Sequence, residues 1–555
     1  MSARFNIKAA DPEAVACLQR ELHMPHFIAA TLVSRGIDTP EAANRFLSPS
    51  LDRDWRDPYT IPGLADVADA LEAAIRRGDH ILVFGDFDLD GISATTVMTR
   101  GLRALGATVT PFIPRRFEEG YAITPAAIDR LSQVNPDFLV TVDCGIACKE
   151  EVRLLEQRGI QVAITDHHEP SDLVPEGVPV ADPKCDAACP SAILAGVGVA
   201  LKMVQALGGR FGKPHLWRQF TDFATLGTIA DLMPMRDENR ALVADGLRHI
   251  NETPRPCIAA LLETSGAAAK QVTATNLSFS IIPRLNAAGR MGDAQLALDL
   301  LLTDSFDEAN QLAQRLESVN DQRRAIEAEL SEIAKAQAAE TYKGQRALVV
   351  AGEGWHEGVK GIVASRLVNT YGVPTLLFTI DGDEARGSGR SVGQVNLFKA
   401  VESCSDLLLR FGGHEAAVGV TLPTEKLPEF ERRLCEYMDA LPEGAFHPLI
   451  TIDACVNLDE LTLRNVAQLD ALAPFGQEHP VPVYLARDVT LLHCRAVGAE
   501  RNHFSCSLSN GRTTVAGIMF HCNDIKALMT TDSVVNAAFE VQIDEWKNRR
   551  SVKAM

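Results

Sequence analysis

The chain of 555 residues is too long for a single hydrophobic core and predicts about three to four domains. Its net charge of −19 excludes a protein that coats nucleic acid by charge alone, although a local basic channel with bound cations could still hold a phosphodiester. No apolar run approaches the ~20 residues of a membrane span, and the N-terminus lacks the apolar core of a signal peptide, so we expect a cytoplasmic protein.

The twelve cysteines are scattered along the chain. Two pairs have CxxxC spacing, Cys144 with Cys148 and Cys185 with Cys189, but neither has the spacing and partners of a zinc site. We therefore expect reduced thiols.

Residues 1 to about 75 are predicted to form short helices and loops, with a helix start at Thr39-Pro40-Glu41. The pattern then changes to apolar runs that alternate with helical stretches. The predicted strands cover residues 81–84, 108–113, 138–142 and 162–165, and the predicted helices lie near 93–106, 124–133 and 149–158. This alternation predicts a parallel sheet with right-handed crossovers, in which ligands bind at the carboxyl ends of the strands.

Acidic and imidazole side chains follow three of these strands and one later helix. They are Asp86, Asp88 and Asp90 in GDFDLDG, Asp143 after FLVTV, Asp166, His167 and His168 after VAIT, and Asp231 at the exit of ATLGTIAD. One acidic turn after a strand would be ordinary. Carboxylates crowded at three strand ends repel one another unless a cation holds them deprotonated, so the pattern predicts a metal site.

The ligand types indicate which metal this site would hold. A calcium EF-hand loop is excluded, because its twelfth position counted from Asp86 is Val97 instead of Glu. Carboxylates and imidazole without paired thiolates suit manganese or magnesium better than a structural zinc. The ligands are more numerous than one ion needs beside its waters, so we expect two ions about 3.5–4 Å apart, the arrangement that runs in-line phosphoester hydrolysis.

Residues 304–340 have the spacing of one long helix. Its predicted apolar stripe consists of Leu312, Leu316, Val319, Ile326, Leu330, Ile333 and Ala336. We interpret this stripe as packing against a domain, with the helix as a rigid strut, and not as a coiled-coil dimer. The last ~105 residues contain five short strand-like runs separated by turn residues, which predicts a small all-β domain.

The motifs GDFDLDG, TVDCGI, TDHH and GTIADLMP stand in the order found in the DHH phosphoesterase superfamily, which the chain resembles. Within it, the chain is most similar to the RecJ family of single-strand-specific exonucleases. The further motifs that carry this resemblance are RRFEEGYAIT, LAGVGVALKM, PRLNAAGRMGDA, GWHEGVKGIVASRL, RGSGRS, FGGHEAAVG and LAPFGQEHPVPVY. Two departures are Cys144, where the family usually has Asn, and PFGQEHP in place of PFGEGNP.

The resemblance implies an α/β fold. A parallel-sheet DHH phosphoesterase domain would be joined by a long helix to a second α/β, DHH-associated domain, followed by a C-terminal OB-like β-barrel. The expected boundaries are 1–75 for an N-terminal helical segment, 76–303 for the phosphoesterase domain, 304–340 for the helix, 341–445 for the substrate-binding DHH-associated domain and 446–555 for the OB-like single-strand-binding domain.

The resemblance also assigns metal ligands and catalytic residues. The implied metal ligands are Asp86, Asp88, Asp90, Asp143, His167 and Asp231, of which Asp143 and His167 also count as catalytic. Asp166 is expected to orient His167 or to tune its loop. His168 is expected to contact a substrate phosphate or to serve as a general acid.

A third set of residues is implied to bind the substrate. Arg116 precedes the aromatic residues Phe117 and Tyr121, which could stack on bases. The other implied positions are Arg284 and Arg290 flanking a NAAG turn, Ser365 and Arg366 on the helix after GWHEG, Arg386 and Arg390 in a Gly-rich loop, and Gly412, Gly413 and His414 in a second such loop.

The implied activity is a metal-dependent exonuclease that degrades single-stranded DNA from the 5′ end to nucleoside 5′-monophosphates, with two Mn²⁺ or Mg²⁺ ions, in DNA repair and recombination. An alternative is a DHH phosphoesterase for oligoribonucleotides, cyclic dinucleotides or pyrophosphate, against which the β-rich residues 450–555 count. A scaffold without activity is disfavoured, because every expected acid is present. The implied partners are single-stranded DNA, a RecQ-type helicase and single-strand-binding protein, with no membrane contact and a monomeric chain.

Overall fold

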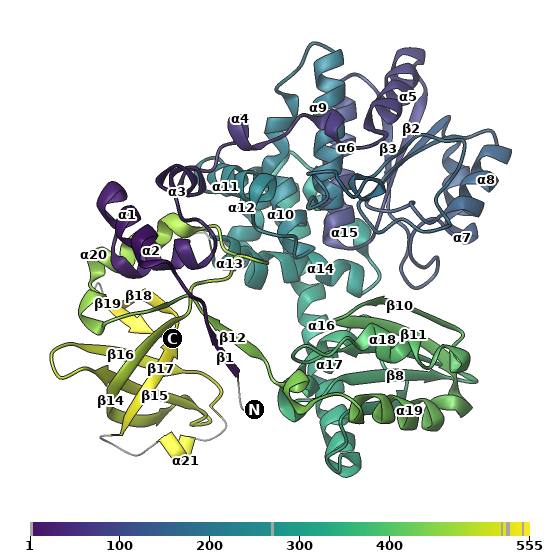
Figure 1. Cartoon of the computed structure of the whole chain (residues 1–555). Helices are drawn as coiled ribbons and strands as arrows, with labels where there is room; N and C mark the ends of the chain where they lie inside the picture. Colours follow the sequence, from purple (N-terminus) through teal and green to yellow (C-terminus); the bar gives the residue numbers. More distant parts are fainter. Residues whose placement is uncertain (1–3, 268–270, 523–524, 529–532, 547–548) are drawn as a thin grey trace. The chain divides into compact units, whose positions relative to one another are not determined.

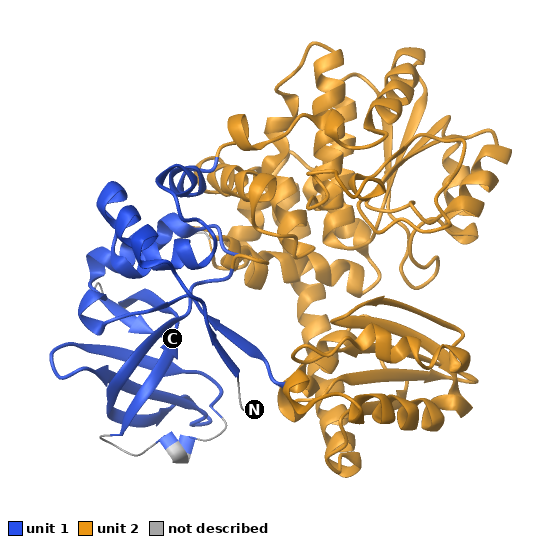
Figure 2. Ribbon diagram, viewed as in Figure 1, with its two compact units in different colours: residues 1–49, 447–475, 480–555 blue, residues 50–446, 476–479 orange. Residues whose placement is uncertain are grey.

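The structure is a computed structural model that describes residues 4–267, 271–522, 525–528, 533–546 and 549–555 (Figure 1). The chain divides into two compact units (Figure 2). Unit 1 comprises residues 1–49, 447–475 and 480–555, and unit 2 comprises residues 50–446 and 476–479. Within the described residues, no helix is both long and apolar enough to cross a membrane.

Unit 2 contains a parallel sheet of five strands in the order β3-β2-β4-β5-β6, as the β-α alternation predicts. Its strands are β2 (His80–Gly85), β3 (Thr108–Phe112), β4 (Phe138–Val142), β5 (Gln161–Thr165) and β6 (Val180–Ala181). Alternate residues of β2 enter opposite cores: Val83 packs with one set of helices, whereas Leu82 packs with another. The sheet is therefore covered on both faces, which requires its strands to be apolar on both sides.

Helices cover this sheet and extend beyond it (Figure 1). Those before and within the sheet region are α4 (Leu51–Asp54), α5 (Leu64–Arg77), α6 (Leu89–Ala104), α7 (Pro125–Leu131), α8 (Lys149–Gln157) and α9 (Gly196–Arg210). Those that follow are α10 (Thr221–Ala230), α11 (Asp237–Glu252), α12 (Pro256–Thr264), α13 (Ala274–Asn276), α14 (Ile282–Arg290) and α15 (Ala294–Leu302). The predicted NAAG turn is wrong, because these residues lie inside α14. The glycine of this motif serves packing of α14 against the loop after β2. A Cβ on Gly289 would lie 2.2 Å from the carbonyl oxygen of Phe87, so the close contact between helix and loop requires a glycine.

The long helix α16 (Phe306–Thr341) leads from these helices to a second sheet. Leu312 and Leu316 near its start lie in the core of the first region, whereas Leu330 near its end lies in the core beneath β7 and α17. The apolar stripe predicted for this helix is wrong at Ile333, which is 47% exposed, and at Ala336, which is exposed as well. It is also interrupted in the middle of the helix, where the fully buried side chains are polar.

The second sheet of unit 2 has the order β10-β11-β9-β8-β7, with only β7 and β8 parallel. Its elements are β7 (Leu348–Glu353), α17 (Lys360–Tyr371), β8 (Thr375–Asp381), β9 (Glu384–Arg390), α18 (Leu397–Glu402), β10 (Arg410–His414), β11 (Ala417–Pro423) and α19 (Leu427–Asp439). The two predicted Gly-rich loops are wrong, since RGSGR forms most of β9 and FGGH most of β10. The glycines serve packing within the sheet: a Cβ on Gly387 would lie 2.4 Å from the ring of Phe378.

Unit 1 joins the two ends of the chain in one hydrophobic core. The C-terminal strands are β12 (Leu449–Ile452), β13 (Ala454–Cys455), β14 (Tyr484–Val497), β15 (His503–Ser509), β16 (Thr514–Met519), β17 (Val534–Phe539), β18 (Val541–Trp546) and β19 (Arg549–Ala554). The short helices α20 (Leu463–Val466) and α21 (Ile525–Leu528) accompany them, and α1 (Pro12–Leu22), α2 (His26–Ser34) and α3 (Pro40–Leu47) come from the N-terminus. The prediction of short helices and loops for the N-terminal segment is wrong at its start, where β1 (Arg4–Ile7) pairs in parallel with β12.

Contacts between the two ends of the chain are specific as well as apolar. Arg35, which follows α2, donates two hydrogen bonds to the carboxylate of Asp453, at 2.8 and 3.0 Å, and both side chains are almost fully buried. Phe27 meets the ring of Tyr484 edge-on at 5.3 Å. The N-terminal helices are therefore an integral part of the C-terminal β-rich module.

Candidate metal centre

The carboxyl ends of three neighbouring strands deliver the acidic side chains to one edge of the first sheet. After β2, Asp88 caps α6 by accepting hydrogen bonds from the amides of Asp90 at 2.9 Å and Gly91 at 3.1 Å. Asp143 follows β4 in the left-handed region, with φ of 60°, a conformation that side chains other than glycine rarely adopt. Such local strain is typical of functional positions and aims the carboxylate into the site.

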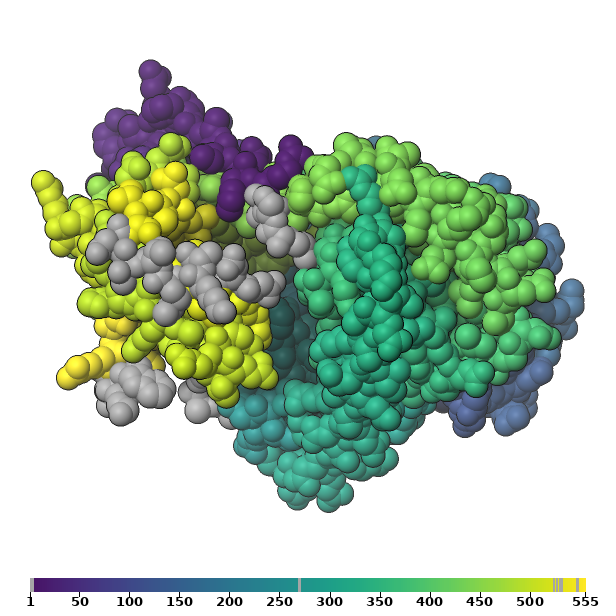
Figure 3. All heavy atoms as spheres, turned by 90° about the horizontal axis from the view of Figure 1, so that it is seen from below, coloured from purple at the N-terminus to yellow at the C-terminus, as the bar shows by residue number. Residues whose placement is uncertain are grey.

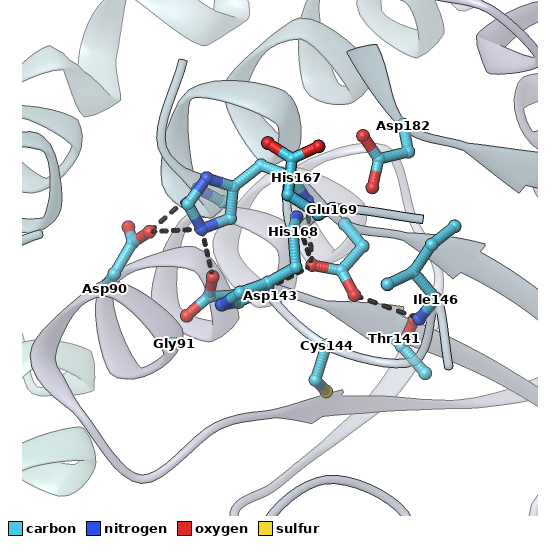
Figure 4. A network of polar contacts seen from close by, with 12 residues as sticks. Asp90, Gly91, Thr141, Asp143, Cys144, Ile146, His167, His168, Glu169 and Asp182 are labelled. Atoms are coloured by element: carbon cyan, nitrogen blue, oxygen red, sulfur yellow. Dashed lines mark hydrogen bonds and ion pairs between the residues drawn. The ribbon is translucent and has the colours of Figure 1, made fainter. Parts of the chain in front are cut away.

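His167 lies at the centre of the acids (Figure 4). Its Nε2 is 3.1 Å from an oxygen of Asp143, 3.6 Å from one of Asp231 and 3.8 Å from one of Asp90. Asp231 follows the C-terminal end of α10, so this acidic side chain is supplied by a helix, whereas Asp143 and His167 follow strands. The structure thus brings together the residues that the sequence analysis implied as metal ligands.

Glycines on the surrounding helices make this crowding possible. A Cβ on Gly196 would lie 2.4 Å from Oδ1 of Asp143, and a Cβ on Gly227 would lie 2.5 Å from Oδ1 of Asp90. Gly196 also begins α9, and its amide donates to Asp90 at 2.7 Å. The sequence analysis did not assign these two glycines, although both stand in the quoted motifs LAGVGVALKM and GTIADLMP.

Burial makes the carboxylates reluctant to ionise. The pKa values of Asp86, Asp90 and Asp143 lie well above their ordinary range, first because they are buried and second because neighbouring carboxylates repel them. The pKa of Asp231 rises to about 6 for the same two reasons. Burial lowers the pKa of His167 to about 3, so this imidazole is neutral and able to act as a ligand.

The donor set fits divalent cations. Asp86 Oδ1, Asp143 Oδ1 and His167 Nδ1 are buried without a hydrogen-bond partner among the described residues. Three overlapping groups of ligand atoms, each within 4.8 Å of one another, occur here: Asp90 with His167 and Asp231, Asp86 with Asp88 and Asp143, and Asp143 with His167 and His168. Carboxylate oxygens with imidazole nitrogen suit Mn²⁺ or Mg²⁺, and this number of ligands exceeds what one ion needs beside its waters.

Asp166 organises the loop beside this centre. Its Oδ1 accepts hydrogen bonds from the amide of His167 at 2.7 Å and from the ring Nδ1 of His168 at 2.7 Å, while its Oδ2 accepts from the amide of Ile146. Asp166 was expected to orient His167 or to tune its loop; its side chain contacts only the backbone amide of His167, and the ring that it contacts is that of His168. Burial alone would lower the pKa of His168, but the hydrogen bond and the charge of Asp166 raise it to about 9.

Three arginines from different elements lie beyond the acids. The Arg116 guanidinium sits 4.9 Å from the ring centre of Phe87, and Arg290 at the end of α14 donates to the carbonyl of Gly358 at 3.2 Å. Burial, followed by the charges of Arg116 and Arg390, lowers the pKa of Arg290 to about 10. A Cβ on Gly361 of α17 would lie 2.5 Å from the Arg390 guanidinium, so Arg290 and Arg390 both lie beside the segment that leads into α17. Phe117 and Tyr121, the aromatics after Arg116, are both about half exposed.

The remaining implied substrate contacts have local partners. Arg284 pairs with Glu317 of α16 at 2.5 Å, and Arg366 pairs with Glu327. Ser365 donates to the carbonyl of Gly361 within α17. Arg386 is exposed beside Asp381 and Glu384, and Gly412, Gly413 and His414 form an exposed edge on β10.

Two further residues near the centre were not assigned from the sequence. Asp182 is fully buried, its Oδ2 has no partner among the described residues, and burial raises its pKa to about 7. Its position after the two-residue strand β6 gave no signal in the sequence pattern. Cys144 replaces the usual Asn of the family, but its Sγ points away from the acids, toward the carbonyl of Phe84 (Figure 4).

Family comparisons match three parts of the chain. The DHH family N-terminal domain matches residues 80–228, the DHHA1 domain matches residues 344–440, and the RecJ OB domain matches residues 452–555. These segments contain, in turn, the parallel sheet with most of its acids, the second sheet and the β-rich module.

Known relatives match the full length of this chain. The chain is 34% identical to "Single-stranded-DNA-specific exonuclease RecJ" of Bacillus subtilis (strain 168), covering 100% of this chain and 70% of that protein. It is 31% identical to the protein of the same name from Escherichia coli (strain K12), covering 100% and 98%. The crystal structure of RecJ from Thermus thermophilus in complex with Mn²⁺ has a TM-score of 0.86 at 29% identity, covering 99% of this chain and 78% of that chain. The same protein with Mg²⁺ gives 0.79 at 28% identity, covering 100% and 78%. With this agreement of sequence and fold from end to end, the chain belongs to the RecJ family.

Proposed function

We propose that this chain hydrolyses single-stranded DNA from its 5′ end and releases nucleoside 5′-monophosphates, with two divalent cations at the acidic centre. The observation that carries the proposal is the cluster of carboxylates around His167, with Arg290 of α14 and Arg390 of the second sheet both beside the segment that leads into α17. The names of the relatives supply the substrate class, since curated family members are called single-stranded-DNA-specific exonucleases.

Separate sets of residues would bind the cations and the phosphate backbone during phosphodiester cleavage. Asp86, Asp88, Asp90, Asp143, His167 and Asp231 would hold the two cations. When bound, these ions supply Lewis-acid charge and an activated water. Arg116, Arg290 and Arg390 would bind and orient the phosphate backbone, because guanidinium groups match the geometry of phosphate oxygens.

We propose that His168 holds a proton near the scissile phosphate. Its pKa of about 9 keeps it cationic at neutral pH, and its Nε2 is 3.5 Å from the hydroxyl of Tyr121, while Asp166 fixes the other nitrogen. A cationic imidazole can bind a phosphate oxygen or donate a proton to the leaving oxygen. We therefore assign His168 to phosphate contact or general acid catalysis and Asp166 to its orientation.

The substrate-binding role extends to the other residues implied by the family. We propose Ser365, Arg366, Arg386, Gly412, Gly413 and His414 as substrate contacts in the region of the second sheet. Arg284, which pairs with Glu317, would contact the substrate at the border of that region. The domain boundary expected at 75/76 falls inside α5 and is moved to 49/50, where unit 2 begins, whereas the boundaries at 303/304, 340/341 and 445/446 remain part of this proposal. So do a cytoplasmic location, a monomeric chain, and a RecQ-type helicase and single-strand-binding protein as partners, since such proteins generate and cover the proposed substrate.

The experiment is a time course with Mn²⁺ on single-stranded DNA labelled at its 5′ or its 3′ end, beside a blunt duplex. Immediate release of a mononucleotide from the 5′ label, with the duplex intact, is the expected result. Cyclic dinucleotide, short oligoribonucleotide and pyrophosphate serve as competing substrates. If one of these is hydrolysed while the single strand survives, the metal centre stands and the substrate assignment is overturned.

A further inference from the structure

The middle of α16 differs from its two ends. The helix buries apolar residues up to Leu316 and again from Leu330, in two separate cores. Between these positions its fully buried side chains are Asn320, 1% exposed, and Glu327, 3% exposed. Burying polar groups without apolar gain destabilises a fold, so a polar middle requires an explanation other than packing. The exposed side of this helix can be followed as teal spheres in Figure 3.

Glu327 is shared by two guanidinium groups. Arg323, one turn earlier on α16, contacts one of its oxygens, and Arg366 of α17 contacts the other. Arg323 also donates from Nη2 to Oδ1 of Asn320 at 2.9 Å. One carboxylate cannot neutralise two guanidiniums, so the cluster keeps a net positive charge.

Donors in this cluster lack acceptors. Arg323 Nε and Asn320 Nδ2 are buried and have no hydrogen-bond partner among the residues that the structure describes. An unpaired buried donor costs about 1–3 kcal/mol. Two such donors beside an excess positive charge specify a ligand that is negatively charged and carries several oxygens, as a phosphate does.

The cluster continues the line of cations that leads from the metal centre. Arg323 is among the charges that, after burial, lower the pKa of Arg290, together with Arg116 and Arg390. Arg366 leaves about half of its side chain exposed, so the cluster opens to solvent. The geometry agrees, because α14, which ends at Arg290, packs against α16 and pairs with it through Arg284 and Glu317, less than two turns before Arg323.

We propose that the middle of α16 is a phosphate-binding element in which Arg323 and Arg366, held in place by Glu327, contact an internal backbone phosphate of the bound single strand. Glu327 is a positioning residue, and Asn320 helps to hold Arg323 in place by accepting a hydrogen bond from its guanidinium. This inference rests on the proposed function, because it requires a single-stranded polyanion as substrate.

The competing interpretation is that Glu327 only neutralises surplus charge in a structural strut. The two interpretations predict opposite signs for Glu327→Gln, which removes the charge and keeps the shape. If Glu327 only neutralises charge, the variant gains positive potential and binds DNA more tightly. If Glu327 positions Arg323 and Arg366, the variant binds DNA more weakly despite its additional positive charge.

The experiment measures the Kd of the full chain for a short 3′-labelled oligonucleotide with a 5′-hydroxyl end, in EDTA to prevent hydrolysis, at several salt concentrations. For Glu327→Gln we expect about a tenfold higher Kd, and a salt slope smaller by about 0.7, the value for one phosphate contact to a single strand. Glu329→Gln, at an exposed acid on the same helix, is the matched control and should change neither quantity.

A Kd for Glu327→Gln equal to or below that of the parent overturns the inference. The variant is judged unfolded if Mn²⁺ no longer raises its melting temperature as it does for the parent. In that case Arg366→Gln tests the inference instead, because the half-exposed side chain of Arg366 can be changed without unfolding a core. Arg366→Gln should weaken binding about threefold or more, and equality with the exposed control Arg324→Gln overturns the inference. A parent chain that neither binds nor degrades the oligonucleotide overturns the proposed function and, with it, this inference.

Discussion

Replacing Asp143 with Asn should stabilise the metal-free chain while abolishing its activity. The Asp143 carboxylate is buried, and its Oδ1 has no hydrogen-bond partner among the described residues. Its backbone has a positive φ, which Asn tolerates better than most residues. The Asp143→Asn variant therefore keeps the shape, relieves the backbone and removes one of several crowded charges.

The ligand atoms of Asp86, Asp88 and Asp143 lie within 4.8 Å of one another. Two unit charges at that distance repel by about 3.5 kcal/mol at an effective dielectric constant of 20. Protonation limits this cost, so we expect the variant to gain about 2–3 kcal/mol without metal, or roughly 5–10 °C for a domain of 150–250 residues. Because the native pKa of Asp143 is raised, the parent loses stability as pH rises above about 4, and the gain should be larger at pH 8 than at pH 5.

Calorimetric melting with EDTA or Mn²⁺ tests this reasoning beside the exonuclease assay. Mn²⁺ at a hundred times its Kd should stabilise the parent by about 2.7 kcal/mol per site, and Asp143→Asn should lose most of this response. Asp137→Asn, at the amino end of the same strand, is the control and should respond to Mn²⁺ as the parent does. A lower metal-free melting temperature for Asp143→Asn, or an undiminished response to Mn²⁺, would refute the assignment.

Three further outcomes are expected. Asp166→Asn removes the partner that raises the pKa of His168, so the alkaline loss of activity should move from about pH 9 to lower pH; an unchanged pH profile contradicts a cationic role for His168. Asp453→Ala leaves Arg35 buried without its carboxylate and should destabilise unit 1 by about 3–5 kcal/mol, with the Mn²⁺ response of unit 2 intact; calorimetry should then show one early transition. Arg390→Gln should reduce the salt slope of single-strand binding by about 0.7, and an unaltered slope would mean that this side chain does not contact phosphate.

The metal centre could be predicted because parallel sheets obey a simple rule. The carboxyl ends of β2, β4 and β5 meet at one edge, so Asp86, Asp143 and His167 had to be close once the β-α alternation was recognised. The close approach of the helices could not be predicted from spacing, because Gly196 and Gly227 matter only through the side chains that they face.

Other features could not be predicted from the sequence because tertiary packing determines them. The Gly and Ser content of RGSGRS predicts a loop, yet β9 pairs along its length with β8 and β11, and its glycines make room for Phe378 and Val418. The pairing of β1 with β12 joins segments more than 400 residues apart, and no local pattern announces it. The polar middle of α16 was missed because an apolar stripe dominates the residues on either side.

The shared core of α1, α2, α3 and the C-terminal strands affects how the chain is synthesised. These three helices are made first, but their apolar partners in residues 447–555 follow about 400 residues later. At about 5–20 residues per second, translation leaves the apolar faces of Leu18 and Phe27 without their native cover for roughly 20–80 s. Unit 2 can thus fold on the ribosome before unit 1 closes, and the first 49 residues depend on chaperones or on their own solubility during that interval.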